Sequence, residues 1–140
     1  MCASSGSRDR EVKSAKLRLG AEGERAAKAF LLAAGYRILY ENYSTPLGEI
    51  DLIAKEGDVV VFVEVKARTS REFGPPQSSV TLTKQRQIVK AAGLFLEREG
   101  LGEVACRFDV VAVTFAGRGA ERPEIVLIRD AFTSGGTPIF

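Results

Sequence analysis

The sequence predicts an α/β protein in which a mixed β-sheet is flanked by helices, in the order helix, three strands, helix, two strands. Two long segments carry apolar residues at helical spacing, and five shorter segments are rich in Val, Ile, Phe and Tyr. The chain has 140 residues, of which 45% are hydrophobic and 27% charged, as expected for one globular domain. We therefore expect a single domain over residues 17–133, between a flexible basic tail (1–16) and a loose C-terminus (134–140).

The first helix is predicted over residues 17–34, where apolar side chains recur every three or four residues until Gly35. Glu24 falls at the edge of the buried face, from which its carboxylate could reach a site on the sheet. A solvent-facing glutamate that stabilises the first helical turn is an equally good interpretation, and Glu22 is a rival. Residues 1–16 lack apolar periodicity, which predicts a mobile tail whose basic side chains could contact phosphate.

A strand over residues 36–43 precedes a β-hairpin that spans residues 48–68, GEIDLIAKEGDVVVFVEVKAR. The second strand of the hairpin is apolar on both faces, which is typical of a central strand covered on both sides. That strand nevertheless ends in Glu64 and Lys66, and charges embedded in this way need partners. The hairpin is therefore where we expect the function to lie.

The acids of the hairpin cluster in either of two registers. Side chains alternate along a strand, so Glu49 and Asp51 should share one side of the first strand, and Glu64 and Lys66 one side of the second. One two-residue turn would place Glu49 opposite Glu64, whereas a shift of two residues would place Asp51 there. Opposed side chains have Cβ atoms about 5 Å apart, a costly spacing for two carboxylates without a cation. The hairpin thus predicts a metal site.

A polar loop over residues 67–79 follows the hairpin and is long enough to border a substrate. Its Arg68 and Arg71 either contact phosphates or are ordinary surface arginines, and the pattern leaves both interpretations open. The second helix is predicted from a cap at Thr81 or Thr83 to about residue 99.

Periodicity does not settle whether Lys84 and Gln85, two polar residues of that helix, turn toward the acids. Strands follow over residues 105–115 and 125–129. Asp109 interrupts the apolar pattern of the first of these strands. It either pairs with basic residues or faces solvent on the less covered side of the sheet, and we favour the solvent-facing interpretation.

Composition excludes several kinds of chemistry. The chain has no histidine, which excludes Ser-His and Cys-His catalysis and most zinc sites. Cys2 lies in a polar tail and Cys106 in an apolar strand, which indicates free thiols. Neither the apolar core of a signal peptide nor a membrane-spanning run is recognisable, so we expect a cytoplasmic protein without a membrane partner. Carboxylates and lysines must then carry any reaction.

The charges are segregated along the chain. Residues 41–65 hold one basic and six acidic side chains, residues 66–90 hold six basic and one acidic, and residues 1–40 hold eight basic and four acidic. An acidic pocket between basic segments suits a metal-dependent enzyme that acts on a polyanion. Solvated helix faces beside a chance acidic hairpin remain the alternative explanation.

The pattern D-x(12)-E-x-K across a hairpin, together with the order of elements, resembles the PD-(D/E)XK nuclease superfamily, which has a restriction-endonuclease-like core. Ile50 stands where that superfamily commonly has a proline before the aspartate. The chain resembles more closely the YraN family (UPF0102-type) of small endonuclease-like proteins. The residues that carry this closer match are Gly20, Gly23, Glu24, Ala27, Gly35, Tyr36, Gly48–Ile53, Phe62–Lys66, Arg68, Phe73, Gly74, Lys84, Ala91 and Arg107–Asp109.

This resemblance implies that Asp51, Glu64 and the backbone carbonyl of Val65 hold Mg²⁺ or Mn²⁺. Lys66 would orient the attacking water and stabilise charge in the transition state, and Glu24 would complete the acidic site. Further candidates are Glu49 and Gln85 as accessory residues, and Arg68, Arg71 and Lys84 as contacts to nucleic acid.

The implied activity is that of an endonuclease that hydrolyses phosphodiester bonds of DNA. Similarity to Holliday junction resolvases suggests branched DNA, a recombination or repair intermediate, and a homodimer, although the sequence carries no mark of dimerisation. Two other functions stay open: a nucleic-acid-binding or partner-docking module with weak or no catalysis, and a metal-dependent hydrolase of small phosphate esters. A surface ladder of ion pairs without a metal is the simplest alternative for the acids and Lys66.

Overall fold

The computed structural model describes residues 3–69, 80–115 and 122–133, and its elements follow the predicted order. The elements are helix α1 (Ala3–Ala33), strands β1 (Arg37–Thr45), β2 (Gly48–Glu56) and β3 (Val59–Arg68), helix α2 (Leu82–Arg98), and strands β4 (Cys106–Thr114) and β5 (Glu124–Phe132). The α/β class and the order αβββαββ are thereby confirmed. Most of the predicted polar loop, including Arg71, and the predicted loose C-terminus lie outside the described residues.

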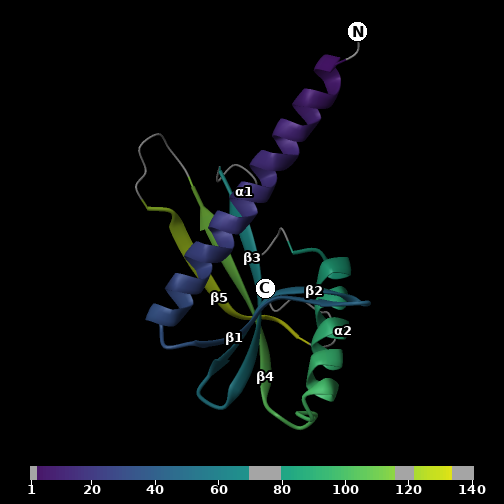
Figure 1. Ribbon diagram of the computed structural model, residues 1–140. Helices are drawn as coiled ribbons and strands as arrows, with labels where there is room; N and C mark the ends of the chain where they lie inside the picture. The colour runs from purple at the N-terminus through teal and green to yellow at the C-terminus, as the bar shows by residue number, and fades with distance from the viewer. Residues whose placement is uncertain (1–2, 70–79, 116–121, 134–140) are drawn as a thin grey trace.

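The five strands form one sheet in the order β1-β2-β3-β4-β5 (Figure 1). Strands β3 and β4 are parallel, while the other neighbours are antiparallel. A parallel pair requires a crossover from one end of the sheet to the other, and helix α2 lies in that connection. The sheet is therefore mixed, as predicted, and β3 occupies its centre.

The hydrophobic core has two layers, one on each face of β3. On one face Val61 and Val63 share a cluster with Leu31 of α1, and on the other Phe62 packs edge-to-face against Phe95 of α2. These side chains are completely or almost completely buried. The prediction of a central strand covered on both sides is confirmed.

The predicted flexible tail is wrong for residues 3–16, which belong to helix α1. The prediction relied on apolar periodicity, but a helix surrounded by solvent does not need it, and side chains 10–18 are exposed. The segment is rich in Arg, Lys, Ser and Ala and has no proline, so it can extend a helix that packing has already nucleated. Figure 1 shows this N-terminal half of α1 reaching beyond the end of the sheet.

The other element boundaries differ little from the predictions. Thr81, not Thr83, caps α2, where its side chain accepts a hydrogen bond from the backbone N–H of Lys84 at 3.2 Å. Strand β5 continues to Phe132 because Ala131 and Phe132 are buried beyond the two charged residues that interrupt its apolar pattern. In the part of the chain that the structure describes, no helix is both long and apolar enough to cross a membrane.

The favoured prediction for Asp109 was wrong, because its side chain is completely buried. It accepts hydrogen bonds from the Tyr36 hydroxyl at 3.0 Å, from Arg107 Nε at 2.8 Å and from the Asp130 backbone N–H at 2.9 Å. Arg107 also donates to Glu56 at 2.9 Å. Burial and the Asp109 carboxylate raise the pKa of Tyr36 to about 12. Asp109 thus pairs with a basic residue, the other predicted alternative, in a network that joins the α1–β1 connection, β2, β4 and β5.

We predict that Asp109→Ala destabilises the fold by about 3–5 kcal/mol, because it leaves the partly buried charge of Arg107 without its main partner. Urea unfolding followed by circular dichroism measures this free energy. Arg129→Gln removes an ion pair whose arginine is 50% exposed and should cost no more than about 1 kcal/mol. Equal losses in the two variants would contradict the proposed importance of burial.

Candidate active site

Strands β2 and β3 separate beside Asp51. Among the described residues, the backbone pairing of β2 with β3 ends at Leu52 and Val63. Beyond this pair, the group on β2 that accepts a hydrogen bond from β3 is a side chain and not a backbone carbonyl. Oδ2 of Asp51 accepts a hydrogen bond from the backbone N–H of Val65 at 2.8 Å. This register sets Asp51 beside Glu64, so the second of the two predicted registers is the one adopted.

The regular alternation of β2 is interrupted at the same point. Ile50 and Ile53 pack on the α2 side of the sheet, whereas Leu52 and Ala54 pack on the α1 side. In a regular strand Ile50 and Leu52 would share a face. The regular alternation that we assumed for the first strand of the hairpin is therefore wrong at Asp51, whose carboxylate lies against the backbone of β3.

A glycine brings helix α1 close to β3. A Cβ added at Gly23 would lie 2.5 Å from the Cβ of Ala67, which is shorter than real carbon contacts. Only glycine therefore permits this approach without a shift of the backbone. The following residue, Glu24, is carried to the place where β2 and β3 separate.

Side chains from α1, β2 and β3 line one cavity of about 430 Å³, which we call the acidic pocket. Its lining comprises Lys16, Leu19, Gly20 and Glu24 of α1, Asp51 of β2, and Glu64, Val65, Lys66 and Ala67 of β3. The four residues predicted as catalytic, Glu24, Asp51, Glu64 and Lys66, thus meet in one place. Their roles stay a prediction.

Glu64 lies in a strongly perturbed environment and is only 5% exposed. Burial above all, and then the Asp51 carboxylate, raise the pKa of Glu64 to about 8. Lys84 Nζ lies 3.9 Å from Glu64 Oε2, too far for a hydrogen bond, and this oxygen has no hydrogen-bond partner in the part of the chain described. A buried carboxylate oxygen without a donor, next to a second carboxylate, is suited to a cation.

Glu24 is held at the pocket by a residue of β1. This residue is Asn42. With its side-chain amide oriented so that the nitrogen donates, that nitrogen lies 3.1 and 3.2 Å from the two Glu24 carboxylate oxygens. Asn42 has a φ of 50°, a left-handed conformation that asparagine tolerates better than most residues. Burial and then Asp51 raise the pKa of Glu24. Glu22, the predicted rival, lines a neighbouring cavity instead.

The two candidate accessory residues, Glu49 and Gln85, do not line the acidic pocket. Glu49 is exposed and accepts a hydrogen bond from the Ser44 hydroxyl at 3.4 Å, although its charge still contributes to the raised pKa of Glu24. Gln85 is buried and donates to the backbone carbonyl of Val80 at 3.0 Å. Gln85 therefore fixes the entry to α2.

Two of the three predicted nucleic-acid contacts are engaged within the protein. Arg68 donates to the Thr114 hydroxyl at 3.1 Å, and Lys84 faces Glu64. The third, Arg71, lies outside the described residues. Contact of these side chains with nucleic acid stays a prediction, and Lys84 gains a role as countercharge to a buried carboxylate.

Lys16 and Asn42 also belong to the site, although the sequence patterns did not predict them. Lys16 was assigned to the tail, although the spacing Lys16, Gly20, Glu24 places all three on adjoining turns of one helix face. That spacing was the available signal. Asn42 offered none, because its contact with Glu24 depends on a positive φ inside a strand.

Asp51, Glu64 and the carbonyl of Val65 are the groups that could hold a divalent cation. Across residues 3–69, 80–115 and 122–133, no three acidic, cysteine or histidine side chains form a ready-made metal-binding group. Two carboxylates and a carbonyl nevertheless suit Mg²⁺, which commonly binds one or two protein carboxylates and keeps several waters. The Glu64 oxygen that has no hydrogen-bond partner among the described residues is also suited to bind such a cation.

Comparison with known proteins places this arrangement in a family. Residues 23–113 match the model of the uncharacterised protein family UPF0102. The chain is 49% identical over 115 residues to a UPF0102 protein of Symbiobacterium thermophilum, which covers 82% of this chain and 96% of that protein. It is 48% identical over 116 residues to a UPF0102 protein of Syntrophus aciditrophicus, which covers 83% of this chain and 89% of that protein.

We predict that Gly23→Ala destabilises the fold by about 1–2 kcal/mol, because overpacking against Ala67 outweighs the higher helix propensity of alanine. Adding Ala67→Gly should recover part of this loss, a positive coupling that a double-mutant cycle of unfolding free energies measures. Gly20→Ala on the same helix meets no atom within 4 Å and should be neutral or stabilising. Strict additivity of Gly23→Ala and Ala67→Gly would argue against the close contact.

A second prediction concerns pH. Because the folded state favours the neutral form of Glu64, with a pKa raised from 4.5 to about 8, this residue lowers the unfolding free energy as pH rises between those values. The glutamine of Glu64→Gln cannot ionise, so the unfolding free energy of this variant in EDTA should fall less than that of the wild type over this pH range. Above pH 8 it should exceed the wild-type value by up to a few kcal/mol. Urea unfolding at several pH values tests this. The exposed Glu49→Gln serves as control, and a Glu64→Gln profile parallel to the wild type would refute the assignment.

Proposed function

This chain belongs to the UPF0102 family, the group to which its sequence motifs had pointed under the name YraN, and we propose that it is a metal-dependent endonuclease acting on DNA phosphodiester bonds. The convergence of Glu24, Asp51, Glu64 and Lys66 from three elements on one cavity carries this proposal. The carboxylates of Asp51 and Glu64 adjoin each other, and one oxygen of the buried Glu64 has no hydrogen-bond partner among the described residues. Such a pair is costly for a fold to maintain without a ligand.

Asp51, Glu64 and the Val65 carbonyl would hold the Mg²⁺ or Mn²⁺ ion. When bound, such an ion polarises the phosphate and lowers the pKa of the attacking water. Asp51 is prepared for this task because its other interaction, with the Val65 N–H, fixes its carboxylate against β3. A ligand that is already oriented loses little conformational entropy on binding.

Lys66 and Glu24 would act on the reacting groups. Lys66 projects from the same side of β3 as Glu64, and its ammonium group would stabilise the negative charge that grows on the phosphate in the transition state. Glu24, held by Asn42, would orient the water and accept its proton. The water oxygen forms the new bond to phosphorus, the ester P–O bond breaks, and the departing sugar oxygen takes a proton from solvent.

DNA is the substrate that we favour, because a polyanion matches the basic segments on both sides of the acidic hairpin. Within this class, branched recombination or repair intermediates follow from the resemblance to Holliday junction resolvases, whose dimers act on two strands. We assign the activity to the cytoplasm, a reducing compartment in which an exposed free thiol such as Cys106 persists.

One observation favours a second candidate, a nucleic-acid-binding module with little or no catalysis. Lys84 already places a positive charge 3.9 Å from Glu64, which partly compensates the carboxylate without a metal ion. In that case the acidic pocket would be a retained feature of the fold, and binding to DNA would not require a divalent ion.

The decisive test incubates the protein with linear, flapped and four-way-junction DNA in Mg²⁺ or Mn²⁺ and follows cleavage on denaturing gels. We predict cleavage that EDTA abolishes, and a loss of about 100-fold or more in Asp51→Asn and in Lys66→Ala. Matched controls are Asp58→Asn in the exposed turn between β2 and β3 and Lys90→Ala on the exposed face of α2, neither of which lines the pocket.

The outcomes separate the two candidates. Cleavage that persists in Asp51→Asn or Lys66→Ala would sink the assignment of the site. DNA binding without cleavage of any substrate, together with no rise in thermal stability on adding Mn²⁺, would favour the binding module.

A further inference from the structure

The N-terminal half of α1 places basic residues beside the acidic pocket. This half extends past the end of the sheet, as Figure 1 shows, and side chains 10–18 are exposed. Lys16 lines the pocket, and Lys13 lies one turn farther out. Both belong to the segment that sequence periodicity had assigned to a tail.

Helix geometry turns these two lysines toward the side of the helix on which the pocket opens. Lys13 precedes Glu24 by eleven residues, which is about three turns, so both lie on the same side and about 16 Å apart along the axis. Lys16 is one turn before Gly20, a residue in the middle of the helical lining of the pocket. Arg25 lies about 140° around the helix from Gly20, on the far side, and lines neither this pocket nor the neighbouring cavity, which Arg18 does line.

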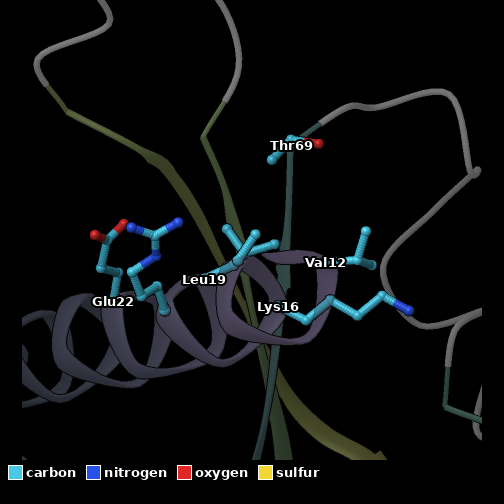
Figure 2. A pocket seen from close by; sticks show the side chains of 7 residues that line it. Val12, Lys16, Leu19, Glu22 and Thr69 are labelled. Carbon is cyan, nitrogen blue, oxygen red and sulfur yellow. The ribbon is translucent and has the colours of Figure 1, made fainter. Parts of the chain in front are cut away.

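A second hollow continues from the pocket along the helix. This cavity of about 450 Å³ shares Lys16 and Leu19 with the acidic pocket and reaches Val12 and Thr69. Figure 2 shows Thr69, beyond the end of β3, facing Leu19 across this space, with Val12 farther toward the helix N-terminus. A chain that leaves the acidic pocket in this direction passes Lys16, and Lys13, which lines neither cavity, lies about one turn farther along the helix.

The charges of these lysines are available. No carboxylate of the described residues pairs with Lys13 or Lys16, whereas Lys84 faces Glu64 and Arg68 contacts Thr114. The predicted nucleic-acid contacts that the structure describes, Arg68 and Lys84, are thus engaged within the protein, whereas no ion pair engages Lys13 or Lys16 among the described residues. An extended polyanion is the ligand that compensates two such charges in line.

We propose that Lys13 and Lys16 form a phosphate-binding track, in which α1 holds the backbone of a DNA duplex that flanks the scissile bond. This inference rests on the proposed function, because the track begins at the acidic pocket in which cleavage would take place. Each strand of a duplex has one phosphate per 3.4 Å of the duplex axis, so the distance of about 16 Å from Glu24 to Lys13 covers four to five phosphates of a duplex whose axis runs parallel to α1. The contacts are to phosphates and carry no sequence preference.

The test compares two double variants with equal loss of charge, each in an Asp51→Asn chain that does not cut. Lys13→Gln/Lys16→Gln removes the track, and Arg25→Gln/Lys90→Gln removes two exposed charges that line neither cavity, one on the far side of α1 and one on α2. Fluorescence anisotropy with a 20-base-pair duplex gives the affinity at several salt concentrations. The track variant should bind about tenfold or more weakly at low salt, with a slope of log K against log salt reduced by about 1.8, since each phosphate contact contributes about 0.9.

Each result has one meaning. Equal weakening in both double variants overturns the track, although DNA binding and the proposed function stand. Absence of duplex binding in the parent chain at low salt overturns the DNA substrate and the track with it. In the cutting chain, with Asp51 intact, Lys13→Gln alone, which lies outside the acidic pocket, should raise KM with kcat nearly unchanged; a fall in kcat alone would also overturn the track. A track variant that loses binding to anionic lipid vesicles but not to DNA would show that the partner is a membrane surface.

Discussion

The arrangement of the whole site depends on one hydrogen bond, from the backbone N–H of Val65 to the Asp51 carboxylate at 2.8 Å. Where β2 and β3 separate, this side chain replaces the backbone acceptor that a continuing ladder would offer, and a charged acceptor stabilises such a bond by about 1.5–3 kcal/mol. The same bond leaves the carboxylate beside Glu64. The sheet thus ends and the pocket begins at a single residue, which also explains why the alternation of β2 is interrupted there.

The features that followed from sequence are those that local rules govern. The order of elements, the central position of β3 and the gathering of acids at the hairpin rest on strand periodicity and turn position, and all three hold in the structure. The register was narrowed to two alternatives, since either turn would close the hairpin. In the observed register Gly57, whose φ is 59°, takes the first position of the two-residue turn, where a positive φ suits glycine.

The features that could not be predicted from the sequence depend on residues far away along the chain, or on the exposure of side chains to solvent. Asp109 looked solvent-facing because its partner Tyr36, and Glu56 that shares Arg107 with it, are far away in sequence, and their network became visible only in three dimensions. The side chains of residues 10–16 are exposed and need no apolar face, so the signal used to find helices was absent where a helix exists. Both errors come from treating a pattern as local when its cause was tertiary.

The contact between Gly23 and Ala67 has a consequence for how this protein could change during evolution. Because α1 is one unbroken helix, the contact fixes both the position of Glu24 and the direction of everything before it. A single residue inserted between Gly23 and Lys16 would rotate the preceding side chains by about 100°, whereas an insertion of seven would keep their facing and move them outward by about 10 Å. The length of this helix can therefore change during evolution only by insertions or deletions close to whole turns, if its lysines are to keep facing the pocket.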